Sequence, residues 1–114
     1  MIRRILFYKN HFTQFYLKQS LKVQEKIDFT LDLIKKIENV PVKFLKHIEG
    51  TKGLYEIRVK VGSNIFRIFC FFEKYHLVIL LSGFQKKSQK TPKKEMKTAL
   101  KLMGEYYDEK KKKK

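Results

Sequence analysis

Cysteine is almost absent from this chain of 114 residues, and that scarcity limits what kind of protein it can be. The one cysteine, Cys70, cannot form an intramolecular disulfide, which argues against a disulfide-stapled secreted domain. We therefore expect a reducing compartment and a cytoplasmic protein. Long apolar runs are also absent, since no stretch approaches the roughly 20 residues that span a bilayer. Residues 1–10 lack a small-residue cleavage site, so we interpret them as containing a strand rather than a signal peptide.

Acidic residues are scarce as well. The chain has 11 Asp and Glu against 27 Lys and Arg, which gives a formal net charge of +16. Residues 110–114 are all lysine and are predicted to form a disordered tail; without them the charge is still +11, so the single domain predicted over residues 1–109 is basic in its own right. Such a surface favours polyanions, with RNA as the first candidate. The alternative is a generally lysine-rich composition that serves solubility.

Several kinds of catalytic site have no support in the sequence. The histidines, His11, His47 and His76, lie in separate elements without the spacing of metal ligands, so neither a metal site nor a cofactor is expected. The chain has no glycine-rich loop that would cradle a phosphate and no nucleophile elbow. Alternation along an apolar strand places Cys70 on the same face as Ile68, where a thiol is expected to be buried and inert.

The residues that are present predict an α+β fold, with an antiparallel, mixed-edge sheet of about four strands packed by two N-terminal helices and a C-terminal helix. Gly62-Ser63 is a signal for a two-residue hairpin turn, and Ser20 is a candidate N-cap. Thr91-Pro92 predicts the cap and first turn of the last helix. We assign no element to residues 42–48. Strands are predicted over residues 2–8, 53–61, 64–72 and 76–84, and helices over 10–19, 20–39 and from 92 to about 108.

Two arginines stand in the apolar strands on either side of the predicted turn. A two-residue loop would pair Val61 with Asn64 and would place Arg58 directly opposite Arg67. At about 5.5 Å and an effective dielectric near 20, their repulsion is about 3 kcal/mol, so the pair makes sense as a clamp for a phosphate. Glu56 lies on the same face, where it could neutralise the pair or transfer a proton. The alternative is a solvated polar face on which Glu56 bridges to one arginine.

The next strand and its loop add a second set of candidates. If Lys74-Tyr75 forms the turn, Ser82 lies opposite Arg67, and Phe84 shares the face of the two arginines. Phe84 could stack on a base or belong to the core, and the sequence leaves both readings open. The residues expected to hold flanking phosphates are the lysines of the basic loop, Lys86, Lys87 and Lys90, together with Lys60 on the arginine-bearing strand.

Three segments with their spacing, residues 53–59, 64–69 and 83–92, resemble the HigB-type, phage-derived (Gp49-like) branch of the RelE toxin superfamily. The resemblance covers about residues 50–107. It implies a RelE-like fold and a ribosome-dependent mRNA interferase, with a HigA-type helix-turn-helix antitoxin as its partner. Arg67 matches the family's central arginine, which stabilises charge at the scissile phosphate. Glu56 and Arg58 fall on the strand that carries basic or acid/base residues in relatives, and Lys86 and Lys87 fall where relatives place basic residues.

The implied reaction is attack by a 2′-hydroxyl of mRNA on the adjacent phosphate. Arg67 and Arg58 would stabilise the developing charge, Glu56 would act as the base, and Lys87 or Lys86 would act as the acid or electrostatic helper. Some relatives use a tyrosine or histidine after the basic loop, but residues 89–92 contain neither, so the general acid is unassigned. Two alternatives stay open: a non-catalytic module that binds RNA or the ribosome and blocks translation, and a degenerate toxin retained as an interaction partner.

Overall fold

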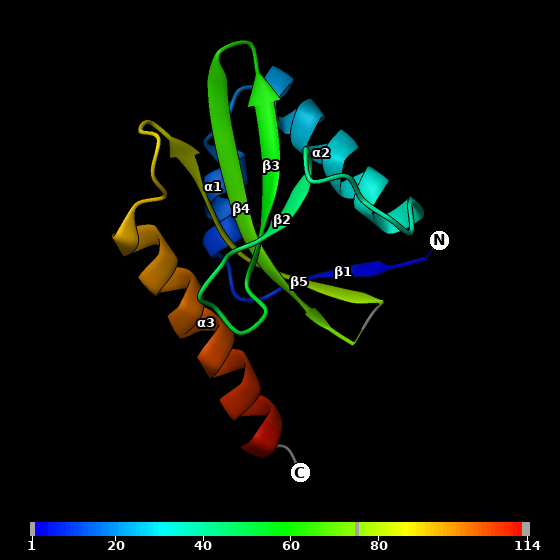
Figure 1. Cartoon of the computed structure of the whole chain (residues 1–114), viewed down its shortest axis with the longest axis vertical. Helices are drawn as coiled ribbons and strands as arrows, with labels where there is room; N and C mark the ends of the chain where they lie inside the picture. Colours follow the sequence, from blue (N-terminus) through cyan, green and yellow to red (C-terminus); the bar gives the residue numbers. More distant parts are fainter. Residues whose placement is uncertain (1, 75, 113–114) are drawn as a thin grey trace.

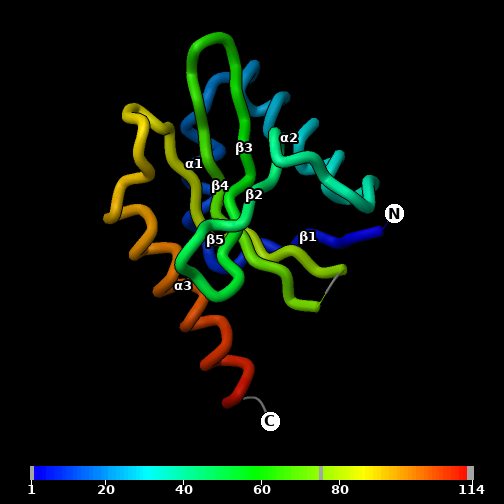
Figure 2. The backbone as a smooth tube through the Cα atoms, viewed as in Figure 1, coloured from blue at the N-terminus to red at the C-terminus, as the bar shows by residue number. Residues whose placement is uncertain are grey.

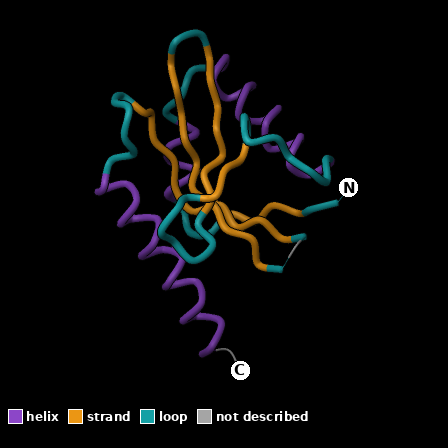
Figure 3. Tube along the Cα trace, in the orientation of Figure 1, coloured by secondary structure: helices purple, strands orange, loops and turns teal. Residues whose placement is uncertain are grey.

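The computed structural model describes residues 2–74 and 76–112. Within these residues, three helices pack around one five-stranded sheet, whose strands lie side by side (Figures 1 and 3). The predicted α+β class is confirmed. The elements are β1 (Arg4–Phe7), α1 (His11–Leu17), α2 (Leu21–Lys36), β2 (Leu45–His47), β3 (Tyr55–Val61), β4 (Asn64–Glu73), β5 (Leu77–Lys86) and α3 (Lys93–Lys112).

The sheet is mixed, in the order β1-β5-β4-β3-β2. β1 runs parallel to β5, and the other neighbours pair antiparallel. The prediction of about four strands missed β2, which occupies three residues of the unassigned segment 42–48. β2 is short because residues 41–44 form a turn, in which the Phe44 N–H donates to the Pro41 carbonyl over 2.9 Å. β2 therefore pairs only with residues 55–57 of β3.

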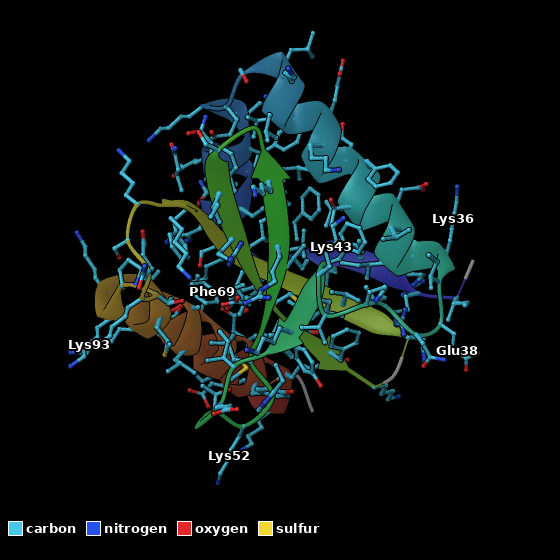
Figure 4. The ribbon with its side chains drawn as sticks, turned by 45° about the horizontal axis from the view of Figure 1, so that its top comes forward. Lys36, Glu38, Lys43, Lys52, Phe69 and Lys93 are labelled. Carbon is cyan, nitrogen blue, oxygen red and sulfur yellow. The ribbon has the colours of Figure 1, made fainter. Side chains whose placement is uncertain are left out.

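The two faces of the sheet carry separate apolar clusters. α2 covers one face, where its Ile27 and Ile34 pack with Ile68 of β4. α3 packs on the other face, where Leu102 and Phe69 belong to a second cluster. Figure 4 shows Phe69 between the sheet and α3. The tip of the β3–β4 hairpin extends beyond α3 in the view of Figure 2.

The start of α2 and the β3–β4 register are as predicted. Ser20 is the N-cap of α2, and its Oγ accepts a hydrogen bond from the Val23 N–H. Arg58 pairs with Arg67 across β3 and β4. Gly62 has a φ of +61°, which glycine adopts without strain, and it allows the tight turn that sets this register.

The predicted register of β5 on β4 is wrong by two residues at the site. Arg67 pairs with Phe84, and Ser82 pairs with Phe69 instead. Three residues rather than two separate the paired ends Glu73 and Leu77, and an irregularity at residues 69–70 shifts the register once more. The two shifts add to an even number, so Ser82 and Phe84 still lie on the face of Arg67.

The C-terminal helix is longer than predicted. α3 continues to Lys112, so the predicted disordered tail is wrong for residues 110–112, while residues 113–114 lie outside the described part. Lys110 forms an ion pair with Glu73 at the end of β4, and its ammonium lies over the ring of Tyr106. Lysines are also favourable in the last turn of a helix. None of the helices in the described residues combines the length and hydropathy that crossing a membrane requires.

Candidate functional site

Glu56, Arg58 and Arg67 form a compact charged group, which we call the arginine cluster. Arg58 Nε donates a hydrogen bond to Glu56 Oε2 over 2.9 Å. Arg67 Nε lies 3.1 Å from the same oxygen in an ion pair, and Arg67 Nη1 donates to the Phe66 carbonyl. Glu56 therefore bridges both arginines, whereas the structural alternative considered above had it bridge one.

The β3–β4 register explains this arrangement. It sets Arg58 opposite Arg67, and the two-residue period of β3 sets Glu56 on the same face. The cluster carries a net charge of +1 and is largely removed from water, since Glu56 is 6% exposed and Arg67 is 9% exposed. Burial lowers the pKa of Arg67 and nearby Arg58 adds to this effect, while Glu56 opposes it. One positive charge of the cluster is therefore not neutralised by a carboxylate within it.

A hollow of about 740 Å³, which we call the front pocket, opens beside the cluster. It brings together four of the residues predicted from sequence, Glu56, Arg58, Lys86 and Lys90. Residues of β2 and the loop after it complete the wall, together with the start of α3. The front pocket is thus a predominantly basic surface that leads to the Glu56 carboxylate.

Lys46 also lines the front pocket, and the sequence did not single it out. It lies directly opposite Glu56 in the β2–β3 pairing, which places it on the face of the cluster. The sequence analysis did not predict this position because it did not recognise β2. His47 lies opposite Tyr55 instead, and its Nε2 is 3.2 Å from the Thr51 carbonyl oxygen. Its ring packs edge-to-face on Tyr55.

Two predicted residues lie elsewhere. Lys87 does not line the front pocket, but a separate hollow beside residues 63–65. Phe84 is 7% exposed and its ring stacks on Phe69 at a centroid distance of 5.5 Å, so Phe84 belongs to the core and is not available as a platform for a base.

The predicted helix cap is also off by one residue, since α3 begins at Lys93 and the Met96 N–H donates to the Pro92 carbonyl.

Cys70 lies in the apolar cluster with Ile68, on the face away from the arginines, as predicted. Burial raises the pKa of its thiol far above the ordinary value, so the reactive thiolate is suppressed. Cys70 is therefore a core residue of the α2 face.

A second hollow, of about 430 Å³, lies on the other side of the cluster, and we call it the edge pocket. Five basic side chains line it without a carboxylate. Lys60 and both arginines come from β3 and β4, as the sequence suggested. The residues missed by the sequence analysis are Lys26 of α2 and Lys43 of the turn before β2, and no local motif marks either of them. Figure 4 shows Lys43 on the segment that runs beside β3.

The fold and these pockets define a small, basic α+β protein whose cationic groups converge on one end of a sheet. The family described as phage-derived protein Gp49-like (DUF891) matches the chain over residues 14–104. The chain therefore belongs to the Gp49-like family of phage-derived proteins. The matched segment contains α2, all of β2 to β5 and the site described above. No curated protein sequence matches the chain.

Proposed function

We propose that this protein is a ribosome-dependent mRNA interferase, the toxin of a type II toxin–antitoxin system of the RelE and HigB type. The arginine cluster carries this proposal, because two guanidinium groups converge on one carboxylate oxygen between two basic pockets. Membership of the Gp49-like family is compatible with such a toxin. The resemblance of residues 53–59, 64–69 and 83–92 to HigB-type toxins supports it further.

The reaction is an in-line transfer at one phosphodiester of the message. The 2′-oxygen bonds to phosphorus while the bond from phosphorus to the 5′-oxygen of the next nucleotide breaks. The products are a 2′,3′-cyclic phosphate and a 5′-hydroxyl. Arg58 and Arg67 stabilise the negative charge that develops on the phosphoryl oxygens, since guanidinium groups pair well with phosphate. Among the described residues, the terminal nitrogens of Arg58 have no hydrogen-bond partner and are available to the phosphate.

Glu56 holds the arginines and takes the proton of the 2′-hydroxyl. Its Oε2 serves the two guanidinium groups, whereas its Oε1 has no hydrogen-bond partner among the described residues. The leaving 5′-oxygen needs a proton or a neighbouring positive charge. Lys46 and Lys86 line the same pocket and are the candidates for this role. Lys87, which faces another hollow, is the weaker candidate.

The ribosome supplies what this site lacks. Carboxylates as a class are weak bases near neutral pH. Holding the 2′-hydroxyl in line with the scissile bond can replace much of the missing acid–base catalysis. We therefore place the active form in the cytoplasm, on translating ribosomes. Its expected inhibitor is a HigA-type helix-turn-helix antitoxin.

The test is primer extension on translated mRNA with wild-type protein and the Arg58→Gln variant. We expect discrete new 5′ ends with the wild type and a loss of about 10²–10³-fold in cleavage rate with Arg58→Gln. Arg58 is the better first target because its side chain is 28% exposed, so its replacement disturbs the core less than replacement of Arg67. Lys52→Gln, in the exposed loop before β3, is the matched loss of one positive charge. Wild-type cleavage by Arg58→Gln would remove the cluster from the mechanism.

A second function is a module that binds RNA or the ribosome and blocks translation without cutting. One observation favours it: His47, the histidine that lines the front pocket, is already engaged by the Thr51 carbonyl, so lysines are the remaining candidates for a general acid in the described pocket. The same primer-extension experiment separates the two functions. Halted protein synthesis with an intact message would support the binding module.

A further inference from the structure

At the edge pocket, the outer edge of β3 has no neighbouring strand. β2 ends at the partner of Ile57, and the Arg58 N–H donates to the Phe44 carbonyl over 2.8 Å. The turn of residues 41–44 then carries the chain away from β3. By the period of a strand, the Lys60 N–H points the same way as the Arg58 N–H. No described strand lies beside it there, so this backbone donor has no strand partner, and Lys60 itself lines the edge pocket.

The side chains around this edge are unbalanced in charge. Lys26, Lys43 and Lys60 have no ion pair with any carboxylate among the described residues. The ammonium groups of Lys26 and Lys43 rest over the rings of Phe29 and Phe44, at 4.9 Å and 5.5 Å from the centroids. These aromatic contacts hold the two lysines at the rim without neutralising them. An anion in the pocket would relieve their mutual repulsion.

We propose that the edge pocket is a second anion site, which binds a backbone phosphate of single-stranded RNA that flanks the phosphate at the arginine cluster. Its volume of about 430 Å³ is within the range of pockets that hold small ligands. Arg58 lines both the edge pocket and the front pocket, so a strand that passes the cluster reaches both. Lys26 and Lys43 are positioning residues in this scheme. The inference rests on the proposed function because that function makes RNA the ligand.

The test compares the double variant Lys26→Gln/Lys43→Gln with the control Lys36→Gln/Lys52→Gln. Both remove two positive charges from partly or fully exposed side chains, and Figure 4 shows Lys36 and Lys52 away from Lys43. The probe is a short, fluorescent, fully 2′-O-methylated RNA, which binds without being cut. Fluorescence anisotropy between about 50 and 200 mM salt gives the affinity and its salt dependence.

We expect the edge-pocket variant to bind this RNA on the order of tenfold more weakly, with a salt slope smaller by about 0.7 for the lost phosphate contact. The effect should be uniform across RNA sequences, because a phosphate contact carries no base information. The control should bind within about twofold of the wild type. Equal affinities and slopes for the two double variants would overturn the second site. Circular dichroism is the check that both variants are folded.

A competition experiment identifies the source of the phosphate. Unlabelled RNA should displace the probe at far lower concentration than a nucleoside monophosphate does. Displacement by both at the same concentration would assign the pocket to a free nucleotide and overturn the strand model.

The outcome for cleavage is separate. On ribosomes, the edge-pocket variant should raise the KM for cleavage with little change in kcat, since it weakens binding outside the reacting centre. If the wild type cuts no message, the proposed enzyme fails, and the anisotropy comparison still decides whether the edge pocket binds RNA. If the wild type cuts message and the edge-pocket variant matches it in both affinity and KM, the second site fails and the proposed enzyme stands.

Discussion

The two faces of the sheet differ in the side chains that β3 and β4 carry. On the α2 face, β3 and β4 are apolar along their length, with Ile57, Val59, Ile68 and Cys70 all buried. On the α3 face, the apolar positions of β4 stop at Phe69, and the next positions of β3 and β4 toward the hairpin tip carry the arginine cluster. The difference teaches that the candidate site is not cut into the core. It occupies the part of the α3 face toward the hairpin tip, beside the start of α3.

A large effect on stability is expected from removing the negative charge of the arginine cluster. Glu56→Gln keeps the side-chain shape but leaves two guanidinium groups facing each other. Losing one member of a buried ion pair costs about 3–5 kcal/mol. Because Arg58 is partly exposed and water screens it, we expect a loss of about 2 kcal/mol in the free energy of unfolding. Urea denaturation at neutral pH measures it.

The control for this prediction is Glu38→Gln, which removes one exposed acidic charge after α2. Added inorganic phosphate should raise the stability of Glu56→Gln more than that of the wild type, because it replaces the missing negative charge. Equal stability of Glu56→Gln and Glu38→Gln would mean that the arginines do not need their shared carboxylate.

On the α2 face, we expect overpacking rather than a change of charge to lower the free energy of unfolding. A Cβ added at Gly83 of β5 would lie 2.5 Å from Cδ2 of Phe15 in α1, so the ring or the helix must move. We expect Gly83→Ala to lower the free energy of unfolding by about 1–3 kcal/mol. At Gly104 of α3 an added Cβ meets nothing within 4 Å. Gly104→Ala should therefore stabilise the protein, by up to about 1 kcal/mol in a helix interior. Thermal or urea unfolding of both variants checks the contrast in sign.

The smallest effect concerns the end of the α3 face where helix and sheet join. Burial alone would raise the pKa of Glu73, but hydrogen bonds from Lys110 and Tyr106 lower it below its ordinary value of 4.5. A carboxyl group with a lowered pKa in the folded state stabilises the protein above pH 4.5, and this contribution disappears as the pH falls through the folded pKa. Glu73→Gln should thus cost about 0.5 kcal/mol at pH 7, given the exposure of Lys110, and less at pH 3.

Urea unfolding of wild type and Glu73→Gln at the two pH values measures this difference. A penalty that is the same at pH 3 and pH 7 would show that the loss comes from packing and not from the ionised carboxylate. Lys110→Gln should reproduce most of the pH-dependent part.

Local signals in the sequence were sufficient for every element except β2 and for the residues of the arginine cluster. Gly62 at a positive φ fixed the β3–β4 turn, and with it the facing arginines. Ser20 marked the start of α2. The β5 register was out of reach, because it depends on a third turn residue and an irregularity at residues 69–70 that no residue type announces.

The rest of the site depends on contacts between distant segments. Lys26 and Lys43 reach the edge pocket only because β2 stops early and α2 lies beside β3. Lys46 became a site residue through its pairing with Glu56. Phe84 had two open readings, and only the stacking on Phe69 decided for the core.

The sharing of Glu56 Oε2 by two guanidinium groups has a consequence for exchange at the site. An incoming anion that draws Arg58 outward leaves the carboxylate still matched by Arg67, so neither buried charge is ever isolated. The same holds in reverse when the anion departs. We therefore expect an anion to exchange at the cluster without separation of the strands.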